Sequence, residues 1–216
     1  MLDKLYARSL MEFLGTGLLS YTVYKASLSG LTSFGQACLV GLCVALLVHM
    51  LGRYSGAHFN PAISIILRIQ SLRVGKALEF DELLETICYI FSQVLGSIIG
   101  MKIARAGHSV YPVYRLDGFM EEVLLTMILL FLVIIWSREG KLCPFAQPLS
   151  GIVMGGGVTF LAILGGLTSS GIFNPAILVG MLISSGEQQG IQLMMWAQLL
   201  AIAFVGLVIR AYQRVR

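Results

Sequence analysis

Charged residues are scarce in this sequence. Asp, Glu, Lys and Arg make up 12% of its 216 residues, whereas soluble globular domains carry about 25%. So few charges cannot cover a water-facing surface, and 57% of the residues are hydrophobic. The composition therefore excludes a soluble globular domain and favours a chain whose natural solvent is lipid.

Basic clusters and metal-binding cysteine patterns are also missing. The net charge of +4 is spread along the chain, which argues against a nucleic-acid partner. The cysteines fit no metal-site spacing, and Cys38, Cys43 and Cys88 lie in apolar stretches, where small core residues are expected. Neither a Ser/His/Asp set nor a Gly-rich phosphate loop appears. We therefore expect no metal, no cofactor and no enzymatic activity.

Long apolar stretches dominate what is present. Six of them are close to the ~20 residues that cross a bilayer as a helix. Two further apolar segments, Pro61–Ile69 and Pro175–Ser184, are too short to span, and each begins with proline after asparagine. Asn is a preferred N-cap, and proline suits the first helical turn. We therefore expect an all-α membrane protein with six transmembrane helices and two re-entrant half-helices. The transmembrane helices are expected at about Leu5–Tyr24, Phe34–Gly52, Leu83–Lys102, Phe119–Trp136, Pro148–Leu167 and Ile191–Ile209.

The second half of the chain repeats features of the first half in the same order. Three matches at similar offsets indicate two repeats of three spans, about residues 1–105 and 118–216, within one channel domain. With three spans per repeat, the second must be inverted relative to the first, and paired interrupted segments point to a transport site at the midplane. The matches are Asn60-Pro61-Ala62-Ile63 with Asn174-Pro175-Ala176-Ile177 after 114 residues, Glu12 and Thr16 with Glu122 and Thr126 after 110, and Gln93 with Gln198 after 105.

The basic residues favour a topology with both termini in the cytoplasm. With the N-terminus inside, the inner loops and tails hold eleven Lys and Arg residues, and the outer loops hold four: Lys25, Lys102, Arg105 and Arg115. Cytoplasmic loops carry an excess of these residues. We therefore predict an integral multi-pass protein whose N- and C-termini are both cytoplasmic.

The two half-helices should meet near the centre of the bilayer. Because the repeats are inverted, their N-termini face each other, and each carries the equivalent of about half a positive charge. Two such ends focused on one point repel cations, protons included. The amides of Asn60 and Asn174 can donate to a passing solute oxygen while their carbonyl oxygens cap the helices.

Two glutamates and a histidine stand out in these surroundings. Glu12 and Glu122 lie in apolar stretches, and a carboxylate at mid-membrane costs about 2.5–3.5 kcal/mol on insertion scales. We expect each to accept hydrogen bonds from the non-helical backbone before a half-helix, whose N–H groups find no partner in lipid. A proton relay is the alternative role. His58, two residues before Asn60, is expected to face a pore, because an apolar core would not select histidine.

The doubled Asn-Pro-Ala segments resemble the twin boxes of the aquaporin and aquaglyceroporin family, the major intrinsic proteins. The likeness covers the whole chain, including the Glu-x-x-x-Thr of spans one and four and the glutamines of spans three and six. It implies an aquaporin-like fold, a homotetramer with one pore per protomer, and a pore lined by His58 and backbone carbonyls. The segments that carry it are Ala57-His58-Phe59-Asn60-Pro61-Ala62 and Gly171-Ile172-Phe173-Asn174-Pro175-Ala176.

The sequence departs from the family at the outer constriction. Members usually carry Arg directly after the second box, where this chain has Ile177. By spacing from the boxes, the other constriction positions are Val40, Ala162 and Gly171. These four residues would make a small-sided, apolar constriction without fixed charge. Its width should admit larger solutes, whereas its dryness should hinder strongly hydrated ones, and both outcomes stay open.

These features together predict a passive transmembrane channel for water and small neutral solutes of the glycerol, urea, peroxide, ammonia or metalloid class. Two alternatives stay open. One is a proton-coupled transporter that uses Glu12 or Glu122. The other is a structural or junction membrane protein whose pore is occluded by aromatic residues such as Phe59, Phe173, Tyr111 and Tyr114.

Overall fold

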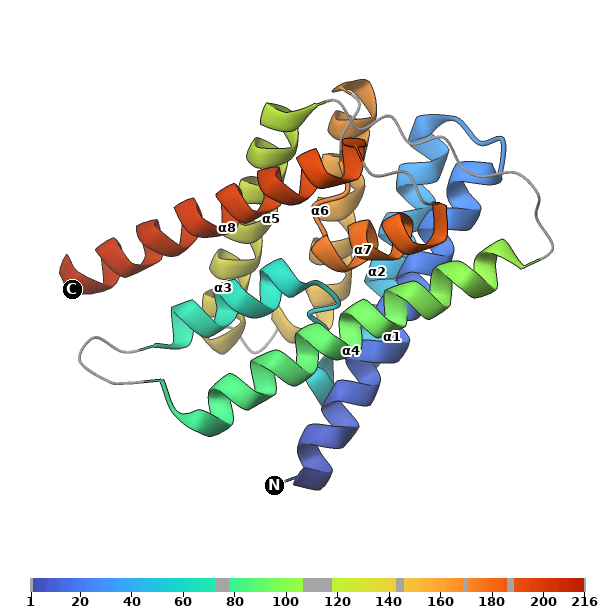
Figure 1. The fold of residues 1–216 in the computed structure, drawn as a ribbon. Coiled ribbons are helices and arrows are strands. Elements are labelled where there is room, and N and C mark those ends of the chain that lie inside the picture. The colour runs from blue at the N-terminus through green and yellow to red at the C-terminus, as the bar shows by residue number, and fades with distance from the viewer. Residues whose placement is uncertain are drawn as a thin grey trace.

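The computed structural model describes residues 2–72, 78–106, 118–142, 146–168, 171–185 and 189–215. Within these residues the fold is all-helical, with six long helices and two short ones, as the sequence predicts (Figure 1). Most of the long helices extend a few residues beyond their predicted ends. The long helices are α1 (Leu2–Leu28), α2 (Ser33–Ser55), α4 (Phe80–Arg105), α5 (Phe119–Leu142), α6 (Ala146–Thr168) and α8 (Gln189–Val215), and the short ones are α3 (Pro61–Ser71) and α7 (Pro175–Ser185).

Five of the long helices, α2, α4, α5, α6 and α8, are long and apolar enough to cross a bilayer. Helix α1 has 27 residues, which is sufficient length, but its stretch is less apolar than the sequence interpretation assumed. A polar stripe at one-turn spacing contributes to this: Glu12, Thr16 and Ser20 are fully buried inside the protein.

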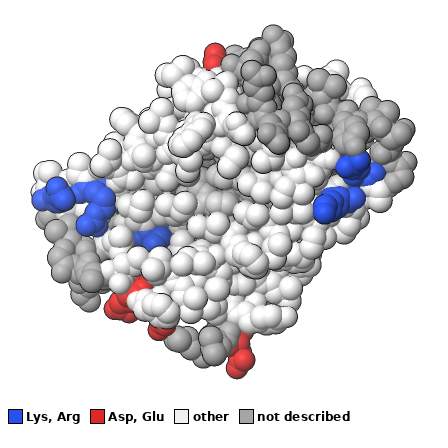
Figure 2. Space-filling model, viewed as in Figure 1, with Lys and Arg blue, Asp and Glu red and all other residues white. Residues whose placement is uncertain are grey.

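Apolar side chains cover the outside of the bundle. On α4, for example, Ile87, Phe91, Leu95, Ile99 and Ile103 follow one another at helical spacing and are all exposed. Figure 2 shows a broad central area without charged side chains on one face, with Lys, Arg, Asp and Glu mostly toward the margins. A surface of this kind fits the hydrocarbon core of a membrane, and it identifies the chain as an integral membrane protein.

The two halves of the chain interlock through their short helices. Helix α1 packs closely on α4, and α2 packs on α6. Helix α3 packs on α8 of the other half, whereas α7 packs on α4 of the first half. Figure 1 shows α3 and α7 end to end in the middle of the bundle. This is the inverted arrangement that three spans per repeat require.

Glycines allow the closest helix contacts. A Cβ atom added at Gly96 of α4 would collide with the carbonyl oxygen of Phe13 and would lie 3.0 Å from the carbonyl carbon of that residue. One added at Gly100 would collide with the carbonyl oxygen of Gly17. Since the obstacles are backbone atoms, α1 and α4 would have to separate. Small residues of this kind are the usual means by which membrane helices approach each other.

We predict that Gly96→Ala lowers the free energy of unfolding by about 1–3 kcal/mol, the usual cost of an overpacked interior. Gly156→Ala is the matched control, because a Cβ atom at exposed Gly156 on α6 meets nothing within 4 Å. Thermal unfolding of both variants in the same detergent checks this. Equal melting temperatures for the two variants would show that the α1–α4 contact is not tight.

Candidate functional site at the meeting point of the half-helices

The loops before the half-helices have an unusual backbone. Phe59 and Phe173, which precede the two asparagines, have φ angles of 49° and 43°. The equivalent loop residues Ala57 and Gly171 have φ angles of 53° and 113°. Residues other than glycine rarely adopt this left-handed region, and they keep it only where the surroundings fix it. The two loops are therefore held by contacts from outside themselves.

Glu12 of α1 provides those contacts in the first half. Its Oε1 accepts hydrogen bonds from the backbone N–H of His58 at 3.0 Å and from the Ser55 hydroxyl at 2.6 Å. Its Oε2 accepts from the backbone N–H of Phe59 at 2.7 Å and from the Gln93 amide at 2.8 Å. A fully buried carboxylate with four donors needs no counter-ion to be stable.

Glu122 of α5 does the same in the second half. Its Oε2 accepts from the backbone N–H groups of Gly171 at 2.8 Å and Ile172 at 3.2 Å. Its Oε1 accepts from the backbone N–H of Phe173 at 2.7 Å and from the Gln198 amide at 2.6 Å. The two glutamates and the two glutamines singled out in the sequence therefore lie together in equivalent clusters, one behind each loop.

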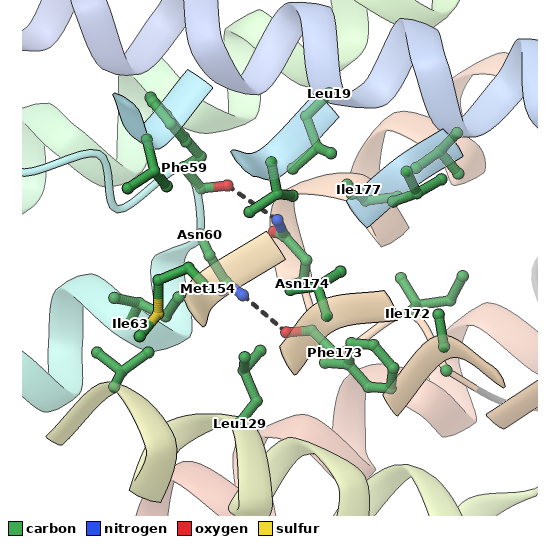
Figure 3. Close-up of a pocket in the computed structure, with 18 of the residues that line it drawn as sticks. Leu19, Phe59, Asn60, Ile63, Leu129, Met154, Ile172, Phe173, Asn174 and Ile177 are labelled. Carbon is green, nitrogen blue, oxygen red and sulfur yellow. Dashed lines mark hydrogen bonds between the residues drawn. The ribbon is translucent and has the colours of Figure 1, made fainter. Parts of the chain in front are cut away.

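The two asparagines join the half-helices to each other. Asn60 Oδ1 accepts from the N–H of Ala62 at 2.9 Å, and its amide nitrogen donates to the Phe173 carbonyl oxygen at 2.8 Å. Asn174 repeats the pattern, with its amide donating to the Phe59 carbonyl at 2.8 Å (Figure 3). Each amide carries two N–H bonds, so one is engaged within the protein and only the second can serve a solute.

The prolines and alanines of the two Asn-Pro-Ala boxes begin the half-helices, and they are not among the residues that line the cavity between the helices. Pro61 and Pro175 are the first residues of α3 and α7. Ala62 and Ala176 are fully buried, and the N–H of Ala176 donates to Asn174 Oδ1 at 3.0 Å.

Two arginines bind the opposite ends of the half-helices. Arg105 of α4 donates to the Ser184 carbonyl at the end of α7, at 2.7 Å. Arg210 of α8 donates to the Leu72 carbonyl just beyond α3, at 3.4 Å. These arginines are 105 residues apart, the same offset as the two glutamines. A cation stabilises the negative end of a helix dipole. The sequence interpretation counted both residues only for topology and missed this role.

His58 lies beside the first loop. Its Nδ1 is 3.1 Å from the Ser64 hydroxyl, which also accepts from the Gln93 amide at 3.0 Å. The imidazole ring meets Tyr89 edge-on, with 5.2 Å between the ring centroids. His58 is thus tied to the hydrogen-bond cluster of Glu12, and it also lines the cavity between the helices.

One cavity of about 570 Å³ runs past the two asparagines. It is lined by six of the helices and by both loops, and His58 is its one readily titratable lining residue among those described. No Asp, Glu, Lys or Arg in the described part of the chain lines it. The four predicted constriction positions, called the outer ring from here on, all line it: Val40, Ala162, Gly171 and Ile177.

Aromatic residues proposed to fill a pore have different placements. Phe59 and Phe173 border the cavity, and each is 3% exposed. Tyr111 and Tyr114 lie outside the described residues. Among the described residues, no group of three His, Cys, Asp or Glu side chains is placed to hold a metal ion.

Comparison with known proteins agrees with this geometry. The model of the major intrinsic protein family matches residues 3–209. The chain belongs to the major intrinsic protein family. The X-ray structure of the aquaglyceroporin from Plasmodium falciparum shares its fold, with a TM-score of 0.70 and 22% identity over 98% of this chain and 96% of that one.

Two curated relatives of this family member are plant proteins. Aquaporin NIP3-1 of Oryza sativa subsp. japonica is 27% identical over 206 residues, which cover 88% of this chain and 61% of the rice protein. Nodulin-26 of Glycine max is 27% identical over 211 residues, which cover 93% of this chain and 72% of the relative. The chain thus spans about three fifths of the rice relative.

We predict that Glu122→Gln destabilises the protein, because an amide has one acceptor oxygen where four donors converge. Each buried N–H group left unpaired costs about 1–3 kcal/mol. Glu121→Gln removes the same charge from the adjacent, partly exposed residue and should have little effect. Melting temperatures in detergent distinguish the two, and equal losses would contradict the loop-supporting role.

Proposed function

We propose that this protein is a passive channel for water and small uncharged solutes. The observation that carries the proposal is the cavity that passes both half-helix N-termini without a charged lining residue in the described chain. Where the two half-helices meet, the cavity is lined by the side-chain amides of Asn60 and Asn174. Each amide can offer one N–H to a solute. A channel of this kind needs no cofactor and no chemical step.

Electrostatics supports the exclusion of ions. The positive ends of α3 and α7 face the same point, while their negative ends are bound by Arg210 and Arg105. Positive potential is therefore concentrated in the centre of the cavity, where a cation would also have to lose its water. We propose that the central asparagines are the barrier to cations and protons.

The outer ring supports a permissive filter. Its residues present only aliphatic side chains or a hydrogen atom, so they offer solutes no side-chain hydrogen bond. We propose that solutes larger than water, in the size class of glycerol and urea, enter this end. The name of the Plasmodium relative, an aquaglyceroporin, agrees with such a class.

The alternatives fit the arrangement less well. Glu12 and Glu122 are fully buried, have four donors each, and are not among the residues that line the cavity. A proton-coupled transporter would need at least one of them accessible. An occluded structural protein would need aromatic side chains across the cavity, and the two candidates that the structure describes, Phe59 and Phe173, are buried in its wall. We also propose a homotetramer with cytoplasmic termini, which chemical crosslinking and terminal reporters can test.

The first test of the channel is flux. Reconstituted vesicles should show faster water and glycerol entry in stopped-flow light scattering than protein-free vesicles. Ile177→Arg should slow glycerol and urea more than water, because it adds a bulky donor to the outer ring. Ile183→Arg, at an exposed position on the same helix, is the matched control. Unchanged solute flux in the Ile177 variant would show that position 177 does not reach the path.

The second test concerns the central barrier. Asn174→Asp should raise cation conductance in planar bilayers, because it adds a negative charge where two positive helix ends meet. Asn174→Ala loses the same hydrogen bond to Phe59 without adding charge, and it should leave conductance nearer to that of the wild type. If both variants leak equally, the hydrogen bond and not the charge is responsible.

A further inference from the structure

The residues that line the cavity follow the internal repeat of the chain. Lining residues of α1 recur on α5 at a spacing of 110, and lining residues of α2 recur on α6 at a spacing of 114. Both members of each pair line the cavity, so the repeat extends to its walls. The α1 and α5 pairs are Leu19 with Leu129, Val23 with Val133, Ala26 with Trp136 and Ser27 with Ser137, and the α2 and α6 pairs are Gln36 with Ser150, Val40 with Met154, Val44 with Val158 and Val48 with Ala162.

The same correspondence gives the outer ring a counterpart in the other half. At a spacing of 114, Val40 corresponds to Met154 and Ala162 corresponds to Val48. In the same way Gly171 of the second loop corresponds to Ala57, and Ile177 of α7 corresponds to Ile63. All four counterparts line the cavity and are partly buried. They are called the inner ring from here on: Val48, Ala57, Ile63 and Met154.

No inner-ring side chain is smaller than its outer-ring counterpart. The inner ring has methionine where the outer ring has valine, valine where it has alanine, and alanine where it has glycine. The fourth position is isoleucine in both rings. The two rings are eight residues apart on α2, about 12 Å of helix. Figure 3 shows Met154 beside Asn60 and Ile63, whereas Ile177 lies on the other side of the two asparagines.

From this comparison we propose that the inner ring, with Met154 as its principal side chain, is the size-limiting constriction and sets which neutral solutes pass. The inference rests on the proposed channel function. A constriction that tightens by several methylene groups rejects the larger of two solutes, while a flexible thioether still lets the smaller one through. In this protein, then, selection by size is made on the α3 side of the asparagines and not at the outer ring.

Flux through reconstituted vesicles tests this with uncharged polyols of increasing length, such as glycerol, erythritol and xylitol. Met154→Ala should raise the permeability of the longer polyols several-fold and that of water less. Met154→Val, which reproduces the outer-ring residue, should have the same effect to a smaller degree. Val40→Ala widens the equivalent outer position and should raise the permeability of the longer polyols far less than Met154→Ala does. Met154→Leu keeps the bulk of the side chain and should likewise raise it far less.

Three outcomes would overturn the proposal. A rise in polyol flux for Val40→Ala but not for Met154→Ala would place the limit at the outer ring. No change in either would place it elsewhere, with Trp136 the next bulky lining residue. Wild-type vesicles that conduct neither water nor polyol would contradict the channel function itself. In that case opening by Met154→Ala would still support the inner ring, and its absence would refute it.

Discussion

Backbone that is not helical cannot remain unpaired inside a membrane, and the rest of this structure follows from how that constraint is met. Each loop before a half-helix has its N–H groups bound by one buried carboxylate, Glu12 or Glu122. Because the carboxylate fixes the loop, Phe59 and Phe173 can keep their left-handed conformation. Their carbonyl groups then lie where the amides of Asn174 and Asn60 reach them. The geometry at the centre of the cavity is thus set by groups that the cavity does not expose.

Several long helices also place polar residues and glycines toward the inside of the protein, where they serve internal contacts. In α1 the polar residues Glu12, Thr16 and Ser20 face inward, and Leu10, Leu14 and Leu18 face outward. Glycine has a comparable role where helices touch. Gly41 of α2 and Gly155 of α6 leave room for the neighbouring backbone, since a Cβ atom at either would collide with the carbonyl of the other helix. Close packing and internal polarity together let 216 residues enclose a cavity.

Much of this could be read from the sequence, because the signals are local or repeated. Apolar length, the Asn-Pro starts and the ordered repeat predict the eight helices and their inverted order. The loop-supporting glutamates follow from the cost of burying a charge. What could not be read depends on which atoms meet in space. The bond from Asn60 to the Phe173 carbonyl and the arginine at the end of each half-helix need the folded chain, and so do the left-handed phenylalanines. Hydropathy also does not tell which face of α1 carries the buried polar residues, because it averages over all faces of the helix.

The reciprocal bonds between the asparagines and the phenylalanine carbonyls bear on how the chain is made. The amide of Asn60 finds its partner 113 residues later in the sequence. At synthesis rates of about 5–20 residues per second, the first repeat waits on the order of ten seconds for that partner. Over this interval α3 has neither its central contact nor α8 to pack on. The hydrogen bonds that join the half-helices can therefore form only after synthesis has passed Phe173 and Asn174, so the centre of both halves is completed together.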